Sequence, residues 1–280
     1  MKRFFVGFLL AVGLIGCTEV QTTRSGAIGV QRKQYMMVSA QQAEQMSASA
    51  YLQEKRVAYS KGALNADTAQ LARLRAIASR IIPQTAVFRP DAPSWKWEVN
   101  LETSNQANAY CMAGGKIMFY TGLLDQLKLS DDEIAAVMAH EISHALREHT
   151  RERLSEAYAQ QMVMAGLAAA AKMNDNQVAA MQNIVQVSMT LPHSREQEAE
   201  ADRMGLELMA RAGYDPRAAI TLWQKMGKMG GGRPPEFLSD HPSDQRRMQD
   251  MQALLPTVMP LYEATKPRAA PASDQRRRRK

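Results

Sequence analysis

Cysteine is scarce in this chain of 280 residues, which contains Cys17 and Cys111 and no others. At most one disulfide can form, so the sequence excludes the class of small exported domains that depend on several disulfides. A chain of this length with 45% hydrophobic residues can bury one sizeable core. We therefore expect that core to hold the fold, with Cys111 as a small buried hydrophobic residue.

Long hydrophobic runs are also absent. Residues 4–15 are apolar and follow Lys2 and Arg3, but this run is too short to remain as a membrane-spanning helix and is typical of a signal peptide. Residues 162–171 are almost wholly apolar and are again too short to span a bilayer. They fit either the protein core or a shallow patch against lipid, and we expect the core.

Aromatic residues make up 6% of the chain, and no basic groove interleaved with aromatics is present, which argues against nucleic acid as a partner. The formal charge of +7 is accounted for by Lys2, Arg3 and the basic residues 276–280. The segment 263–280, rich in proline and alanine, is predicted to be a disordered basic tail. It fits a solvated tail and contact with anionic lipid headgroups equally well.

The stretch that carries chemistry is residues 140–144, which read His-Glu-Ile-Ser-His. Ser130 starts a capping box, and the residues after it predict one uninterrupted helix. A spacing of four puts His140 and His144 on one helix face, where both imidazoles can reach one ion about 2.1 Å away. Glu141 can take a proton from a metal-bound water and is the predicted general base.

A second stretch, residues 194–202, reads as another helix start and contains several carboxylates. The histidine pair alone also fits an amphipathic helix with two hydrogen-bonded histidines, but zinc in a hydrolase needs a third protein ligand. Glu198 is favoured over Glu196 and Glu200 because Asp202 lies one turn further along the same face. There Asp202 can accept the free N–H of a ligand histidine and fix its tautomer.

Four blocks of sequence resemble the gluzincin metallopeptidases, a family that includes CAAX prenyl endopeptidases, HtpX-like membrane proteases and bacterial periplasmic lipoprotein metallopeptidases. The blocks are residues 108–115 with 121–123, residues 140–144, residues 198–202, and His241 and Pro242 with Arg247. The resemblance implies one Zn²⁺ per chain with His140, His144 and Glu198 as ligands, Glu141 as general base and Asp202 as support for a ligand. Cys111 departs from the family pattern in a minor way, because a small or apolar residue is expected there.

Residues 14–17, Leu-Ile-Gly-Cys, resemble the bacterial lipobox. The resemblance implies that residues 1–16 are a lipoprotein signal peptide and that Cys17 carries the lipid, the alternative being an ordinary signal peptide with a chance cysteine. Because Thr18 is not aspartate, it further implies an outer-membrane lipoprotein of the bacterial cell envelope that faces the periplasm.

The rest of the chain divides into an N-terminal tether and helix over residues 17–60 and a metallopeptidase domain over residues 61–262. Helices are predicted at 39–61, 64–82 and 151–172, with a further one ending near residue 189. A strand is predicted at 95–101 and a hairpin at 109–120. Asn108, Gly114 and Gly115 lie where a substrate backbone could add to the sheet edge, although the glycines also fit a plain turn.

Two further basic residues are candidates for catalysis. His241 follows a glycine-rich loop near residue 230 that could serve as a lid hinge, and Arg247 begins the next helix. Either could stabilise the oxyanion of a tetrahedral intermediate, and His241 could instead fill the fourth zinc position and keep the enzyme latent. His149 and His193 lack ligand spacing and are interpreted as structural or solvated.

The sequence thus predicts a mainly helical α+β protein, zincin-like, with a small sheet and the histidine pair on an active-site helix. Its predicted function is that of a zinc-dependent endopeptidase cleaving unfolded or misassembled proteins of the cell envelope, its partners being those substrates and the membrane. The alternative is an envelope-protein assembly factor or chaperone whose protease activity is secondary or latent.

Overall fold

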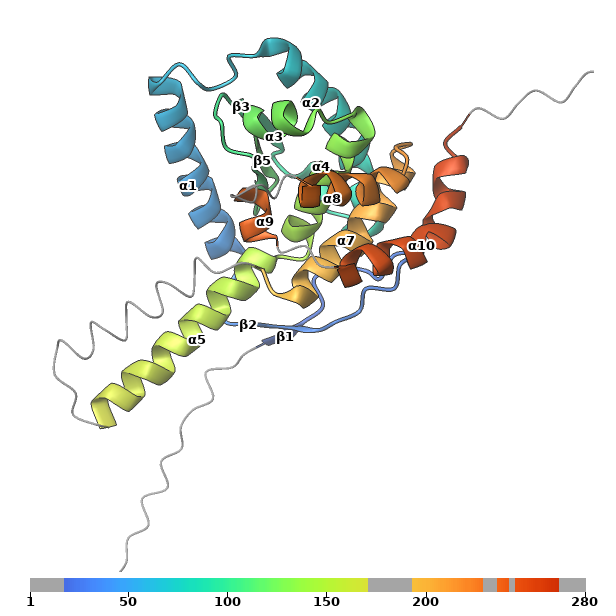
Figure 1. Cartoon of the computed structure of the whole chain (residues 1–280). Coiled ribbons are helices and arrows are strands. Elements are labelled where there is room, and N and C mark those ends of the chain that lie inside the picture. Colours follow the sequence, from blue (N-terminus) through green and yellow to red (C-terminus); the bar gives the residue numbers. More distant parts are fainter. Residues whose placement is uncertain (1–17, 171–192, 229–235, 242–244, 267–280) are drawn as a thin grey trace, which may run out of the picture.

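The computed structural model of the chain describes residues 18–170, 193–228, 236–241 and 245–266 (Figure 1). The predicted signal peptide and Cys17, the helix that ends near residue 189, the glycine-rich loop near residue 230 and the tail beyond residue 266 lie outside the described residues. The strands are β1 (Thr18–Val20), β2 (Gln34–Met36), β3 (Glu98–Glu102), β4 (Ala109–Met112) and β5 (Lys116–Tyr120). The α-helices are α1 (Ala40–Ser60), α2 (Thr68–Ile81), α3 (Thr121–Leu127), α4 (Asp131–Leu146), α5 (His149–Ala170), α7 (Arg195–Arg211), α8 (Arg217–Lys228), α9 (Glu236–Asp240) and α10 (Gln245–Glu263).

The predicted α+β class is confirmed, because the described chain is mainly helical and contains one three-stranded sheet and one two-stranded sheet. The larger sheet has the order β3-β5-β4, with β3 parallel to β5 and β4 antiparallel to it. β4 and β5 form the predicted hairpin, whose turn contains Gly114 at φ +77° and Gly115 at φ +79°. β4 is an edge strand, since no described strand pairs with its outer side.

Helix α4 is the centre of the fold, where it packs against β4, α7, α8 and α2. Ser130 and Glu133 form the predicted capping box: the Ser130 hydroxyl accepts from the Glu133 amide, and the Glu133 carboxylate accepts from the Ser130 amide. All residues from Ile134 to Leu146 are buried. Because α4 contacts neighbours on every side, its histidines are held in a closely packed interior.

The most extensive helix contact is between α4 and α7. Gly205 lies at this crossing, where a Cβ atom in its place would be 3.2 Å from the His140 amide nitrogen. The absence of a side chain lets the α7 backbone approach α4 closely. The crossing therefore brings the carboxylates of α7 against the histidines of α4.

Several element predictions hold, and two need correction at their boundaries. The helices predicted near residues 39–61 and 64–82 correspond to α1 and α2, but Leu64 forms a bridge with Glu102 before α2 begins. The predicted strand begins later, at Glu98, because Trp95 and Trp97 stack on each other ahead of it. Hydrophobic alternation marked the strand correctly but continued into the preceding turn.

The prediction of a tether differs from the structure over residues 18–38, here called the N-terminal arm. β1 and β2 pair, and the arm buries Gln34 completely together with the apolar Ile28 and Met36. The Glu207 carboxylate on α7 accepts hydrogen bonds from the amides of Ala27 and Ile28. The polar composition of the arm suggested a solvated chain, whereas its polar groups bond to buried groups of the domain that contains α4 and α7.

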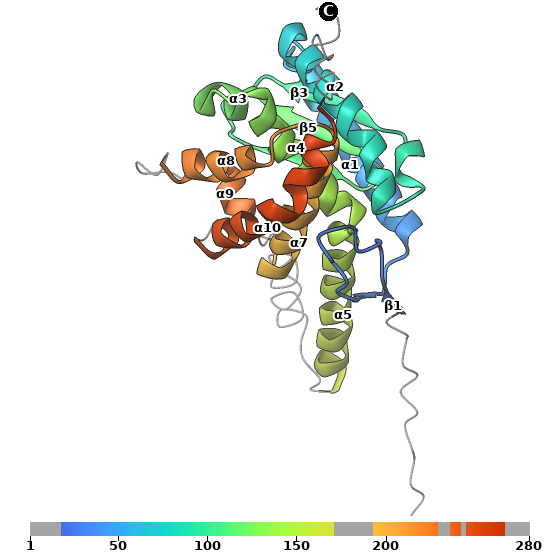
Figure 2. The same cartoon turned by 90° about the vertical axis from the view of Figure 1, so that its right-hand side faces the viewer.

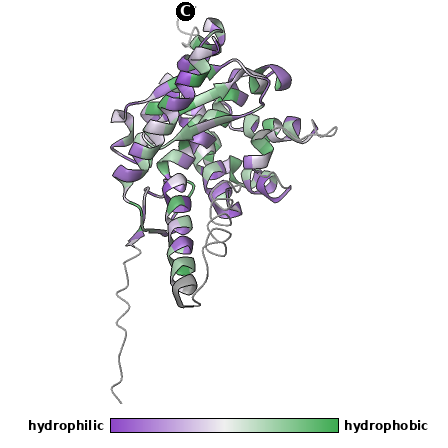
Figure 3. Ribbon diagram, turned by 90° about the vertical axis from the view of Figure 1, so that its left-hand side faces the viewer, coloured by the Kyte–Doolittle hydropathy of each residue, from purple (hydrophilic) through white to green (hydrophobic). Residues whose placement is uncertain are grey.

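Helix α5 extends beyond the other described helices and strands in two perpendicular views (Figures 1 and 2). The prediction that residues 162–171 belong to the core is wrong for the described side chains, since Met162 is 39% and Val163 62% exposed. Figure 3 shows hydrophobic residues toward the far end of this helix. The alternative, a shallow patch against lipid, stays a prediction. Among the described residues, no helix combines the length and hydropathy needed to cross a membrane.

Candidate active site

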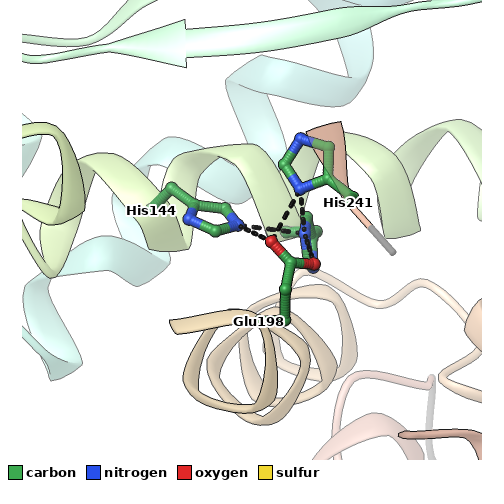
Figure 4. Close-up of side chains that lie close together, drawn as sticks. His144, Glu198 and His241 are labelled. Atoms are coloured by element: carbon green, nitrogen blue, oxygen red, sulfur yellow. Dashed lines mark hydrogen bonds and ion pairs between the residues drawn. The ribbon is translucent and has the colours of Figure 1, made fainter. Parts of the chain in front are cut away.

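The predicted ligands come together where α4 crosses α7 (Figure 4). Nε2 of His140 and Nε2 of His144 lie 3.1 Å apart. The two carboxylate oxygens of Glu198 lie 3.4 Å from the first nitrogen and 3.3 Å from the second. His241 joins the cluster, with Nδ1 located 2.9 Å from Glu198 Oε1 and 3.3 Å from His140 Nε2.

These distances fit a zinc site. Four donors about 2.1 Å from one ion at tetrahedral angles lie roughly 3.4 Å from one another, which is close to the spacing of this cluster. Imidazole nitrogens and a carboxylate oxygen are also the donors that catalytic zinc takes. The residues present therefore fit Zn²⁺, with His140, His144 and Glu198 as the ligands that α4 and α7 provide.

The charge of the site favours a dication. Three buried carboxylates, Glu141, Glu198 and Asp202, surround the histidines, and the buried guanidinium of Arg247 opposes them, which leaves a formal excess of two negative charges. Burial alone would raise the pKa of Glu198, but His241, His140 and His144 hold it well below its usual range. Burial would lower the pKa of His140, but Asp202 and Glu198 raise it to about 10. A metal ion binding here would thus displace a proton.

Glu141 is placed as a general base should be. Its carboxylate is buried, and its Oε1 accepts no hydrogen bond from the described residues. This oxygen lies 3.4 Å from Nε2 of His241. Burial raises the pKa of Glu141, although the nearby His241 and His140 oppose that rise. A buried carboxylate oxygen that accepts no hydrogen bond and lies beside a cluster of metal-binding side chains can accept a proton from a reacting water.

A cleft of about 490 Å³ opens onto the cluster. β4 and Asn108 form part of its wall, α1 contributes Met46, α5 contributes Leu154, and Glu141 and His144 lie in it. The cleft gives an extended chain access to the predicted base along the outer edge of β4, with which no strand in the described part of the chain pairs.

His241 is held in the cluster by the short helix α9. The Phe237 amide donates to the Ala107 carbonyl, and the His241 amide donates to the Phe237 carbonyl. The Phe237 and His241 rings stack with centroids 4.5 Å apart. Asn108 contributes as well, because its side-chain amide donates to the Asp240 carboxylate. The segment before β4 thus fixes the position of His241.

Asp202 and Arg247 lie behind the ligands. Asp202 Oδ1 is 3.1 Å from Nδ1 of His140. Arg247 donates to both oxygens of Asp202 at 2.7 Å, places Nη1 2.8 Å from Glu198 Oε2, and stacks its guanidinium over Trp223. The position of Asp202 is the one expected from its spacing. That of Arg247 disfavours the predicted oxyanion role, because each of its nitrogens already contacts a carboxylate.

Gly114 and Gly115 do not lie along the cleft edge. They form the tight turn of the β4–β5 hairpin, where a Cβ at Gly115 would come within 2.6 Å of the Trp97 ring. Of the three residues predicted at a substrate strand, Asn108 lines the cleft, whereas the glycines serve the turn.

Sequence reasoning missed the part played by His149. Its ring is completely buried, with Nδ1 located 2.9 Å from Nδ1 of His144 and Nε2 located 3.0 Å from Glu200. Helical spacing could not reveal this contact, because α4 ends at Leu146 and Glu148 takes a left-handed conformation at φ +55°. The turn directs His149, the first residue of α5, back toward His144. The nearby His193 is half-buried, with its ring centroid 4.1 Å from that of His144.

Comparison with known proteins gives one matching family, Peptidase family M48, over residues 68–255. The chain is 39% identical to the mitochondrial metalloendopeptidase OMA1 of Arabidopsis thaliana over 159 residues, which are 54% of this chain and 30% of the relative. It is 36% identical to the OMA1 of Schizosaccharomyces pombe over 58% of this chain and 47% of the relative. It is 29% identical to the metalloprotease LoiP of Escherichia coli over 53% of this chain and 59% of the relative. The chain thus covers less than two thirds of the length of these relatives.

Zinc should stabilise the folded protein through Glu198. At a free zinc concentration about 100 times the Kd, binding stabilises the fold by about 2.7 kcal/mol, or roughly 5–10 °C in Tm. We expect Glu198→Gln to abolish this rise, because the ligand charge is lost. Glu196→Gln, an exposed neighbour on the same helix, should keep it. The measurement is thermal unfolding in zinc-buffered solution, and an undiminished rise in Glu198→Gln would contradict the ligand assignment.

Proposed function

The chain belongs to peptidase family M48, and from that premise we propose that it is a zinc-dependent endopeptidase that cleaves unfolded or misassembled proteins of the bacterial cell envelope. The observation that carries the proposal is the buried Glu141 carboxylate, which lies between a cluster of zinc-binding donors and a cleft bounded by an unpaired strand edge. A base beside an open cleft supports catalysis better than a purely structural metal site.

The chemistry follows from the residues around the cleft. When bound, zinc lowers the pKa of a coordinated water and polarises the scissile carbonyl. Glu141 takes the proton of the attacking water and later delivers it to the leaving amine. His140, His144 and Glu198 would hold the ion, while Asp202 would orient His140 and Arg247 would restrain the carboxylates of Glu198 and Asp202.

We propose that His241 occupies the fourth zinc position in the resting enzyme and thereby blocks access of water and substrate. Its Nδ1 lies at the spacing of a fourth zinc ligand, the position that water and substrate need for the reaction. Its Nε2 lies near Glu141 as well. These two contacts support latency over the oxyanion role, and displacement of His241 by substrate would open the site.

The substrate class is inferred from the edge of β4 and from an apolar groove next to the cleft. An extended polypeptide can add to the edge strand only where its own backbone is unpaired, which favours unfolded segments. A groove of about 680 Å³ between α1 and α5 shares Met46 and Leu154 with the cleft and continues to Met37, Ala157 and Tyr158. Hydrophobic side chains, which unfolded proteins expose, would contact this groove beyond the scissile bond.

We propose that a lipid on Cys17 anchors the enzyme to the membrane. β1 begins at the next residue, Thr18, and the N-terminal arm packs on the catalytic domain. A lipid on Cys17 would therefore hold the domain close to the membrane surface rather than at the end of a long linker. We place the protein in the outer membrane, facing the periplasm, and propose that its basic tail adds contact with anionic headgroups.

The first prediction concerns cleavage itself. Residues 18–280 loaded with zinc should cleave a permanently unfolded protein, and Glu141→Gln should lower the rate at least about 100-fold because the base is lost. The readout is the appearance of fragments by mass spectrometry. Equal zinc content in both proteins is the control, because it separates loss of the base from loss of the metal.

In the same assay, His241→Ala should cleave faster than the wild type, because the fourth position is then open to water and substrate. A slower rate would support the oxyanion role instead. If zinc-loaded wild type and His241→Ala both bind unfolded protein without cleaving it, the peptidase proposal fails and the assembly-factor alternative gains.

A second prediction tests the groove. Tyr158, 49% exposed, lines the groove but not the cleft. Tyr158→Gln should raise KM for an unfolded protein by up to about tenfold, since a buried apolar contact contributes about 1.5 kcal/mol. A short peptide that spans only the cleft should be cleaved normally. Tyr59→Gln, an exposed tyrosine on α1 outside the groove, is the control, and equal effects of both substitutions would contradict the assignment.

A third prediction tests the anchor. In bacterial cells, Cys17→Ser should move the protein from the membrane fraction to the soluble fraction, because the thiol that accepts the lipid is gone. Fractionation with immunodetection gives the readout, and Cys111→Ser serves as a control for loss of a cysteine. Unchanged membrane association of Cys17→Ser would contradict anchoring at this residue.

A further inference from the structure

The second nitrogen of His144 has a buried partner. Figure 4 shows one ring nitrogen of His144 directed at Glu198 and the other directed away from it. The latter, Nδ1, lies 2.9 Å from Nδ1 of His149, which has no exposed surface. Two ring nitrogens can form this bond only if one carries the hydrogen and the other accepts it.

Glu200 decides which nitrogen carries the hydrogen. Nε2 of His149 lies 3.0 Å from Oε2 of Glu200, and an ionised carboxylate can only accept. Nε2 of His149 must therefore be the donor. In a neutral His149 ring the single hydrogen is then on Nε2, so Nδ1 is the acceptor that faces His144. Nδ1 of His144 then carries the hydrogen, and Nε2 of His144 is left with its lone pair toward the metal cluster.

Glu200 is itself fixed from two sides. Arg147, completely buried, donates to Oε1 at 2.8 Å and to Oε2 at 3.2 Å. Arg32 of the N-terminal arm donates to the same two oxygens at 3.1 and 2.9 Å. Two guanidinium groups thus donate to both oxygens of Glu200, which matches a carboxylate that only accepts, and the arm helps to hold it.

We propose that His149 is a positioning residue that, backed by Glu200, sets the tautomer and orientation of His144 for the metal. The proposal deepens the proposed function and rests on it, because it takes His144 as a zinc ligand. The chain of contacts runs from Arg32 on the arm through Glu200 and His149 to His144, so the segment that follows Cys17 supports the metal site. Hydrogen-bond partners of ligand histidines typically change metal affinity 10–100-fold when they are removed.

Two substitutions of nearly equal shape test the proposal. His149→Leu removes the acceptor that faces His144, whereas His149→Asn can present an amide oxygen at the same place, and both lose the contact with Glu200. We expect His149→Leu to bind zinc about 10–100-fold more weakly than the wild type and His149→Asn to recover most of that loss. Competition with a chromophoric chelator measures the affinity. Equal affinity in the two variants, or wild-type affinity in His149→Leu, would overturn the proposal.

A second measurement needs no variant and decides the matter if His149→Leu does not fold. ¹⁵N NMR of the zinc-loaded wild type should show His144 protonated at Nδ1 and His149 protonated at Nε2. The opposite tautomer of His149 would overturn the proposal. Glu207→Gln is the matched control for affinity, because Glu207 is another buried carboxylate of α7 that holds the arm but contacts neither histidine. If the wild type bound no zinc, the proposed function would fail; zinc binding with the wrong tautomer would contradict only the role of His149.

Discussion

The close crossing of α4 and α7 is the constraint on which the rest of the structure depends. It buries Glu198 and Asp202 from α7 against His140 and His144 from α4, and Gly205 makes the approach possible. Buried carboxylates are costly unless cations and donors surround them. Here one guanidinium, Arg247, contacts Glu198 and Asp202, and Glu141 is a third buried carboxylate nearby, so the interior retains a formal excess of negative charge that a divalent ion would offset. Metal binding and the stability of this crossing are therefore expected to be coupled.

The same constraint explains the parts that surround the crossing. Glu200 and Glu207, on α7, are also buried and require partners, which Arg147, His149 and the N-terminal arm provide. A segment of polar composition therefore became part of the catalytic domain rather than a linker. On the side of the cleft, α9 brings His241 to the remaining donor position and is tied to the segment before β4. The buried carboxylates of α7 and their partners thus both hold the fold together and form the metal site.

The parts of the site that the sequence predicted correctly depend on short-range patterns within single helices. The capping boxes at Ser130 and Ser194 begin α4 and α7, and a spacing of four placed His140 beside His144. Glu198 was predicted as the third ligand because Asp202 lies one turn further along the same helix face. The role of His149 was missed because it depends on a left-handed residue, Glu148, between two helices, which periodicity does not describe. Met162 and Val163 were wrongly assigned to the core because apolar composition does not show whether a helix has a neighbour.

Anomalous diffraction at the zinc edge from crystals of the zinc-loaded protein would test directly whether α4 and α7 provide the zinc ligands. We predict one strong peak per chain, about 2.0–2.2 Å from Nε2 of His140, Nε2 of His144 and a carboxylate oxygen of Glu198. The outcome that would contradict it is a zinc-loaded protein with no peak at the crossing of α4 and α7, or with its only peak on other residues. Zinc would then not be held by the groups on which the proposed chemistry depends.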